Sequence, residues 1–442
     1  MSAVIEGFGG EIVGPDDPGY DAASRTVLAG GTPAYVIRPA SVEDVQAAVR
    51  YATASGLPLA VRGGGHSFAA FGTNDGGLVI DLAGLAGIEV IDKDKHVVRV
   101  GGGATWGQVA TALQPHNLAI SSGDTKSVGV AGLTLTGGMG WKVRKYGLAL
   151  DQLVAVQVVT AAGAVVRAAA DENAELFWAI RGGGGNFGIV TAFEFAAHPT
   201  TDIFFGKILF PATEIADVLP AWADYMRTAP AGLTGIASFA NPFLGGPQAP
   251  LQIELAYDGD DAELAAQAID PIRALGTVLA DDVTLTPYAE VLVDGAIPPP
   301  GIQLVTRSAF VDKDSVPEAL RILAETGTSQ GSPIIAIRSV GGAVAEIADD
   351  ATAYAYRQAE LMFALTVIGP PPVIAATRPA GQELWDRLTP HTNGAYANFL
   401  SDAEDADVAA VYPAKTYERL AAVKREYDPE NVFASNHNVR PA

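Results

Sequence analysis

The run Arg62-Gly63-Gly64-Gly65-His66-Ser67 constrains this chain more than any other feature of the sequence. Three successive glycines give up side-chain packing and cost backbone entropy. A chain keeps such a run mainly where backbone N–H groups must approach a ligand such as a pyrophosphate closely. The loop follows an apolar, strand-like stretch at residues 57–61. The pattern predicts a nucleotide cofactor site with His66 against the cofactor; a tight structural turn is the alternative.

Two further glycine-rich segments support the first. The small residues of segment 129–141 would let the backbone lie against a large planar ligand, although a close-packed helix crossing would need them too. Segment 181–190 places four glycines between a helical and a strand-like stretch, as expected for donors to a phosphate or ribose. Neither places G-x-G-x-x-G at the start of a helix that follows a strand, as a nicotinamide site does, and no Walker A motif occurs. The candidate contacts are Gly129, Gly132, Gly138, Trp141, Asn186, Gly188 and Val190.

Composition removes several classes of function. A net charge of −22 argues against nucleic acid and anionic membrane surfaces as partners. The absence of cysteine excludes disulfides, thiolate metal sites and cysteine nucleophiles. The histidines other than His66 are scattered, so we expect no metal site and expect surface or satisfied residues, with the role of His437 in the tail left open. No apolar run reaches about 18 residues, and residues 1–7 lack the features of a signal peptide. We therefore expect a cytoplasmic protein with no membrane partner.

The arrangement of elements indicates an α+β protein. Helix and strand signals alternate over the first 200 residues, and the length of 442 residues suggests two or three domains. Beyond them, longer alternating strands such as 251–257 predict an antiparallel sheet covered by helices on one face. The run Pro370-Pro371-Pro372 reads as a loop between such elements.

Together these motifs resemble the flavin-linked oxidases of the vanillyl-alcohol-oxidase superfamily, and in particular its berberine-bridge-enzyme-like branch. The resemblance covers essentially the whole chain and is densest in the first 200 and last 40 residues. The matching segments are residues 62–67, 128–133, 137–140, 177–188 and 427–431.

The resemblance implies a PCMH-type FAD-binding domain of two α+β subdomains at residues 1–200 and a substrate-binding domain with an antiparallel sheet at 201–402. Residues 403–442 would return to the FAD-binding domain. His66 aligns with the histidine that bonds covalently to the 8α-methyl group of the flavin. Thr125 stands where many relatives carry a second attachment residue, a cysteine, so we expect a single covalent link. Asn436 and Asn438 match the tail that returns to the flavin.

The catalytic base is assigned on a looser match. The segment 394–399 resembles a Tyr-x-Asn-Tyr pattern of the family, with Phe399 in place of the second tyrosine. Tyr396 and Asn398 would share one face of a strand, and we predict the catalytic groups there. Glu254 is another candidate. The alternative for all three is that they are ordinary side chains of the sheet without a catalytic role.

The resulting expectation is an FAD-dependent oxidase that removes a hydride from a small organic substrate. That substrate would be an alcohol, a sugar or an amine, and dioxygen would reoxidise the flavin to give hydrogen peroxide. The alternatives are a flavin dehydrogenase that uses another acceptor and a flavin-binding protein without turnover.

Overall fold

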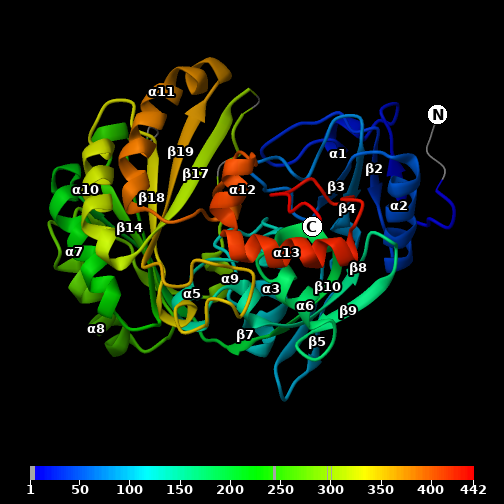
Figure 1. The fold of residues 1–442 in the computed structure, drawn as a ribbon. Coiled ribbons are helices and arrows are strands. Elements are labelled where there is room, and N and C mark those ends of the chain that lie inside the picture. Colours follow the sequence, from blue (N-terminus) through cyan, green and yellow to red (C-terminus); the bar gives the residue numbers. More distant parts are fainter. Residues whose placement is uncertain (1–4, 242–244, 296, 300) are drawn as a thin grey trace.

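Three large β-sheets with helices around them form the α+β architecture of the chain (Figure 1). A computed structural model describes residues 5–241, 245–295, 297–299 and 301–442. Residues 1–4, part of the segment 1–7 in which we expect no signal peptide, lie outside the described residues. Within the described residues, no helix is long and apolar enough to cross a membrane.

The first sheet carries the Arg62–Ser67 loop. Its strands run in the order β1-β2-β4-β3, and β4 pairs in parallel with both β2 and β3. The long helix between β2 and β3 starts at Ser41, whose side chain accepts the Asp44 backbone N–H, and stops at Gly56 in the left-handed conformation. The loop itself leaves the end of β3. The bounds are β1 Glu11–Val13, α1 Tyr20–Ala23, β2 Tyr35–Arg38, α2 Val42–Ser55, β3 Leu59–Arg62 and β4 Leu78–Asp81.

The second sheet is antiparallel, with the order β5-β6-β10-β8-β9. Two of its antiparallel pairs, β5–β6 and β8–β9, are hairpins of strands that follow each other in the sequence. The bounds of this part are β5 Ile88–Asp92, β6 Val97–Gly101, α3 Trp106–Leu113, β7 Leu118–Ala119, α4 Val130–Thr136, α5 Val143–Tyr146, β8 Leu153–Val159, β9 Val165–Ala169, α6 Ala174–Ile180, β10 Ile189–Ala196 and β11 His198–Pro199.

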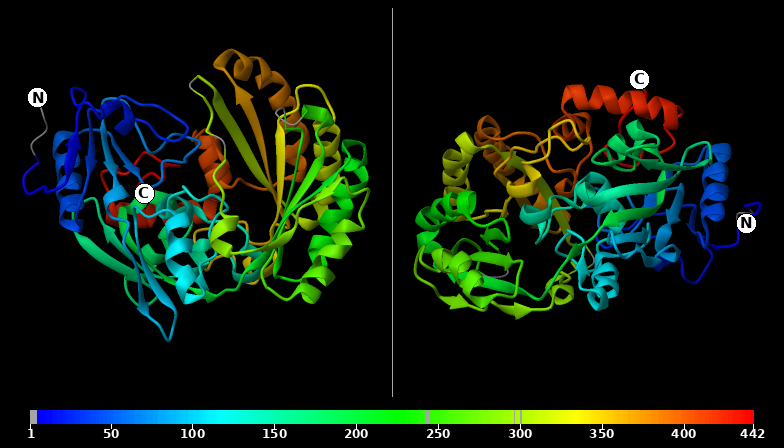
Figure 2. Two further views of the ribbon diagram at one scale, coloured as in Figure 1. Left: turned by 180° about the vertical axis from the view of Figure 1, so that it is seen from behind. Right: turned by 90° about the horizontal axis from the view of Figure 1, so that it is seen from below.

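The third sheet is the predicted long antiparallel one, in the order β15-β12-β14-β13-β18-β19-β17 with β16 beside β12. Figure 2 shows its helices on the side that faces away from the first two sheets. The bounds are β12 Ile203–Phe210, α7 Ile215–Thr228, β13 Leu233–Phe239, β14 Leu251–Tyr257, α8 Ala262–Arg273, β15 Ala280–Asp281, β16 Thr284–Thr286, α9 Tyr288–Val291, β17 Gln303–Val311, α10 Val316–Gly327, β18 Ile334–Ser339, β19 Leu361–Gly369 and α11 Pro371–Leu388.

Strand alternation gives the third sheet two different faces. Ile253, Ile337 and Phe363 pack into the core beneath the helices. Their neighbours Glu254 and Arg338 lie on the opposite face, which is turned toward the first two sheets. The polar side chains of this sheet are thereby brought to the junction between the two halves of the molecule.

The predicted proline loop before α11 is wrong in part. Pro371 and Pro372 are the first residues of that helix, and only Pro370 lies outside it. Proline suits the first turn of a helix because its missing N–H would have no partner there.

The end of the chain crosses back to the first half of the molecule. Helices α12 (Asp405–Val411) and α13 (Ala414–Tyr427) lead to a tail that ends beside α13 (Figure 1), where the Ala442 N–H donates to the Ala421 carbonyl at 3.2 Å. The fully buried Lys424 Nζ donates to Asp428 Oδ2 at 2.7 Å and to the carbonyl oxygens of Asn186 and Phe433 at 2.7 and 2.9 Å. One ammonium group therefore joins the last helix, the tail and the glycine segment 181–190.

We predict that Lys424→Met destabilises the protein strongly. The substitution leaves the Asp428 carboxylate and two carbonyl groups buried without their cation, which costs about 3–5 kcal/mol. Arg440→Ala is the control, because its ion pair with Asp405 is exposed and worth about 0–1 kcal/mol. Urea unfolding of both variants measures the difference, and equal midpoints would contradict the role given to Lys424.

Candidate active site: a glycine-walled cavity

A cavity of about 560 Å³ lies between the first two sheets, the third sheet and the C-terminal tail. Segments far apart in the sequence meet in its wall. The predicted residues that line it are Arg62, Gly63, Gly64, Gly65, His66, Ser67, Thr125, Gly129, Gly132, Gly188, Val190, Tyr396, Asn398 and Asn436. Most of the predicted cofactor contacts are thus brought to one place.

Two of the glycine segments touch each other backbone to backbone. A Cβ on Gly64 would lie 2.2 Å from the Gly129 nitrogen, and a Cβ on Gly129 would lie 2.2 Å from the Gly64 nitrogen. Neither position can hold a side chain. Gly65 adds a φ of +71°, which only glycine adopts without cost. The two segments pack this closely while both remain open to the cavity.

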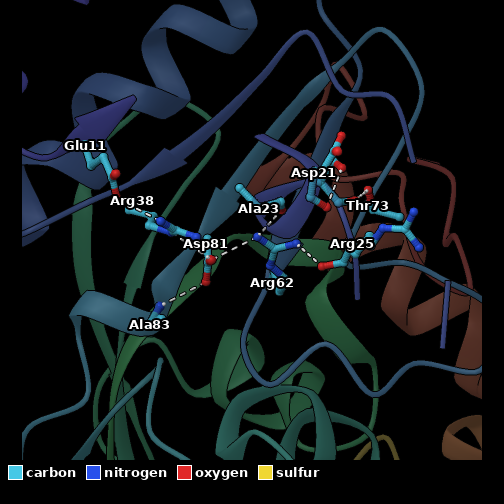
Figure 3. A network of polar contacts seen from close by, with 10 residues as sticks. Glu11, Asp21, Ala23, Arg25, Arg38, Arg62, Thr73, Asp81 and Ala83 are labelled. Carbon is cyan, nitrogen blue, oxygen red and sulfur yellow. Dashed lines mark hydrogen bonds and ion pairs between the residues drawn. The ribbon is translucent and has the colours of Figure 1, made fainter. Parts of the chain in front are cut away.

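The Arg62 side chain supports the loop from behind (Figure 3). Its guanidinium donates to Asp81 Oδ2 at 2.9 Å and to the carbonyl oxygens of Ala23 and Arg25 at 2.8 and 2.9 Å. All of its charge is therefore engaged within the protein, and Arg62 contributes the position of the loop that follows it.

His66 lies in the cavity wall at the end of this loop. Its Nε2 is 2.9 Å from Ser127 Oγ, which in turn donates to Asp294 Oδ1 at 2.6 Å. Burial lowers the pKa of His66 below its usual value, against an opposing effect of Asp294. The imidazole is therefore neutral at neutral pH and free to act as a nucleophile.

Tyr396 and Asn398 converge on one point, although the predicted strand is wrong. Residues 397–399 form a single 3₁₀ turn, closed by the Phe399 N–H donating to the Tyr396 carbonyl. Asn398 Nδ2 donates to Tyr396 Oη at 3.1 Å, and the Gly138 N–H donates to the same oxygen at 2.9 Å. Burial raises the pKa of Tyr396, and these two N–H bonds counter that rise.

Four predicted contacts lie outside the residues that line the cavity: Gly138, Trp141, Asn186 and Asn438. Gly138 acts through Tyr396, as described. Trp141 packs its ring edge-on against Phe205 at 5.1 Å. Asn186 is fully buried and ties the tail down, donating to the His437 carbonyl at 3.1 Å and accepting the Val439 N–H at 2.9 Å. Two of these four therefore act one layer behind the wall.

The tail presents polar atoms that lack partners. Asn436 Oδ1 and His437 Nε2 are buried in the cavity wall, and neither has a hydrogen-bond partner among the described residues. The place of His437, which the sequence left open, is thus the cavity wall. Unpaired buried polar atoms are costly, so their presence in a cavity points to a polar ligand. Together with the glycine wall, they fit an extended nucleotide cofactor such as FAD.

Sequence reasoning missed Ser127 and Asp294. Asp294 comes from the segment after α9, 167 residues from Ser127, and no sequence motif links them. Glu254, the other candidate base, lies on β14 outside the lining residues, with its pKa raised by burial and by nearby Asp124.

Comparison with known proteins relates the chain to FAD enzymes. The FAD binding domain family matches residues 33–169, and the berberine and berberine-like family matches residues 395–440. The (R)-6-hydroxynicotine oxidase of Paenarthrobacter nicotinovorans is 32% identical, over 98% of this chain and 97% of the relative.

Two solved structures share the fold over 98% of this chain. One is 6-hydroxy-D-nicotine oxidase from Arthrobacter nicotinovorans, with a TM-score of 0.86, 30% identity and 98% of its own chain covered. The other is glucooligosaccharide oxidase from Acremonium strictum, described with a 6-S-cysteinyl, 8α-N1-histidyl FAD, with a TM-score of 0.82, 26% identity and 97% of its chain covered.

The fold and the cavity thus define an FAD-dependent oxidoreductase. More narrowly, this chain belongs to the berberine-bridge-enzyme-like family of FAD-linked oxidases. The family resemblance and the α+β fold class inferred from the sequence are both confirmed.

We predict that Gly64→Ala greatly reduces the FAD content of the purified protein. The new methyl group would collide with the Gly129 backbone and force the two cavity segments apart. Gly30→Ala is the control, because a Cβ there meets nothing within 4 Å and Gly30 is exposed. The ratio of flavin to protein absorbance measures the effect. Normal flavin content in Gly64→Ala would contradict it.

Proposed function

We propose that this enzyme carries FAD on one covalent bond from His66 to the 8α-methyl group. We further propose that it oxidises a small alcohol, sugar or amine, with Tyr396 as the base and dioxygen as the electron acceptor. The observation that carries the proposal is that His66 and Tyr396 line the same cavity. A nucleophile for the cofactor and a proton acceptor for the substrate would thus face one space.

Thr125 supports a single bond. It lies in the cavity wall, where a cysteine would be placed to form a second link, and its hydroxyl donates to Asp124 Oδ1 at 3.0 Å. A threonine hydroxyl is a far weaker nucleophile than a thiolate at neutral pH. The chain contains no cysteine to replace it.

Tyr396 is suited to hold negative charge. Two N–H groups, from Gly138 and Asn398, donate to its oxygen, and Asn398 is held in turn by Thr136, whose hydroxyl donates to Asn398 Oδ1 at 2.6 Å. Fixed donors of this kind stabilise a developing phenolate without reorganisation. Bound FAD supplies the hydride acceptor, and Tyr396 would take the substrate proton as the hydride leaves.

Apolar side chains would hold the rest of the substrate and exclude water. Phe68 and Phe399 lie with ring centroids 6.0 Å apart in the cavity wall, and Leu304 of β17 lines it too. In this proposal residues 1–200 bind the cofactor, residues 201–402 supply the substrate wall, and residues 403–442 return to close the cofactor site.

A substrate panel tests the proposed reaction. Purified yellow protein is mixed with alcohols, sugars and amines, and flavin bleaching, oxygen uptake and hydrogen peroxide release are followed. Bleaching together with stoichiometric peroxide supports an oxidase. Bleaching that only an added dye reverses would indicate a dehydrogenase, and no bleaching with any substrate class would favour a binding protein.

We predict that the flavin is found on one tryptic peptide. The peptide of residues 63–93 should carry the added FAD mass, and the peptide of residues 100–126, which contains Thr125, should not. His66→Ala should bind FAD that acid denaturation releases, whereas His116→Gln, at an exposed histidine outside the cavity lining, should keep the covalent mass. Flavin that acid releases completely from the wild-type protein would refute the covalent bond.

We predict that Tyr396→Phe slows flavin reduction by substrate about 10²- to 10⁴-fold, the usual contribution of a general base. Because the pKa of Tyr396 lies above its usual value, the wild-type rate should rise with pH from neutral into the alkaline range. The variant should lose this rise. Stopped-flow reduction measures both.

Tyr356→Phe is the matched control for that experiment. The Tyr356 hydroxyl donates to the Ala410 carbonyl at 2.6 Å, and the residue lies outside the cavity lining. Its rate and pH profile should stay close to wild type. A Tyr396→Phe enzyme with an unchanged alkaline rise would move the role of base to another group, Glu254 being the next candidate.

A further inference from the structure

The contacts of His66 extend beyond the cofactor segments to a loop of the other half of the chain. Val293 N–H donates to the Asp124 carbonyl at 3.2 Å, which docks the segment after α9 against residues 124–127. Ser127 then bonds Asp294 Oδ1 twice, through its backbone N–H at 2.9 Å and its hydroxyl at 2.6 Å. His66 Nε2 meets the same hydroxyl oxygen at 2.9 Å.

The proton positions in the hydrogen-bonded series His66, Ser127 and Asp294 follow from the chemistry of these three side chains. The bonds from Ser127 hold the pKa of Asp294 below its usual value, helped by nearby Lys126, so Asp294 is a carboxylate and can only accept. Ser127 has one hydroxyl proton, which is therefore directed at Asp294. The Ser127 oxygen then accepts from His66, and the proton of the neutral imidazole must be on Nε2.

This arrangement leaves Nδ1 as the nitrogen with the free lone pair. No described residue forms a hydrogen bond with Nδ1. A single tautomer is thereby selected, whereas free histidine populates both.

We propose that Ser127 and Asp294 are positioning residues for the attachment of FAD, which present His66 Nδ1 as the nucleophile and receive the Nε2 proton when the bond forms. This inference rests on the covalent link of the proposed function. It adds two residues that the cofactor motifs do not contain, one of them from the substrate half of the chain.

The proton balance of the attachment reaction gives Ser127 and Asp294 a second role. Attachment breaks one C–H bond of the 8α-methyl group and forms one bond from carbon to Nδ1. Two electrons and two protons are released, and dioxygen takes them up by way of the flavin ring to become hydrogen peroxide. One of those protons is the Nε2 proton, because an alkylated imidazole that kept it would stay cationic. Ser127 can hand that proton to the Asp294 carboxylate.

The experiment follows covalent attachment over time in protein prepared from riboflavin-limited cells and then given FAD. Ser127→Ala and Asp294→Asn should bind FAD but attach it about 10- to 100-fold more slowly, the usual effect of removing the partner that orients a functional histidine. Ser127→Thr and Asp294→Glu should restore much of the rate. The covalent fraction is measured as added mass on the peptide of residues 63–93.

The pH profile separates positioning from damage to the fold. Asp294 raises the pKa of His66, so its loss should move the acidic limb of the attachment rate to lower pH while the maximum rate falls. Glu290→Gln removes an exposed carboxylate from α9, directly before this segment, and should change neither the limb nor the maximum. Wild-type attachment rates in Ser127→Ala and Asp294→Asn would overturn the inference, as would slowing without a shift of the limb.

Failure of the proposed function would be seen separately. If wild-type protein carries no flavin mass on His66, the covalent link is refuted, and ¹⁵N-histidine NMR of the FAD-bound protein decides the rest. A His66 with Nε2 protonated in wild type and a mixture of tautomers in Asp294→Asn supports the pair. The same spectrum in both proteins overturns it.

Discussion

The close backbone approach of Gly64 to Gly129 is the contact on which the site depends. The loop after β3 and the segment that leads into α4 can form one thin wall because neither carries a side chain at the contact. The wall leaves the backbone N–H groups of both loops near the cavity, where an anionic group can reach them. A larger residue at either position would push these two segments apart and open this wall of the cavity.

Around this wall, charged and polar side chains divide into two groups. The first group forms its hydrogen bonds within the protein and holds the loop and the tail in place; it consists of Arg62, Lys424 and Asn186. Buried groups of this kind are costly unless they are fully paired, and these are paired. In the second group, Asn436 Oδ1 and His437 Nε2 are buried without a described partner in residues that line the cavity.

The part of the cavity wall that comes from the third sheet and from the turn after it forms in a different way. The third sheet alternates apolar side chains toward its helices with polar ones toward the junction, and the turn after it brings Tyr396 and Asn398 to the cavity. Asp294 reaches His66 from a loop of the same half. Both halves of the chain therefore contribute to the cofactor site, so its geometry depends on how they dock.

Much of this protein could be predicted from its residues alone. Glycine runs, period-two strands and the Ser41 cap are local signals, because backbone conformation and one-sided burial act over a few residues. They predicted the antiparallel sheet and singled out His66 and the glycine loops that the structure brings to one cavity. The tertiary structure alone decided that Gly138 and Asn186 act from behind the wall, and that Tyr396 and Asn398 meet through a turn. It also decided that Ser127 and Asp294 complete the surroundings of His66. Apart from the local turn that joins Tyr396 and Asn398, those roles depend on contacts between residues 61 to 258 positions apart, and no local pattern encodes which distant partner a hydrogen bond will find.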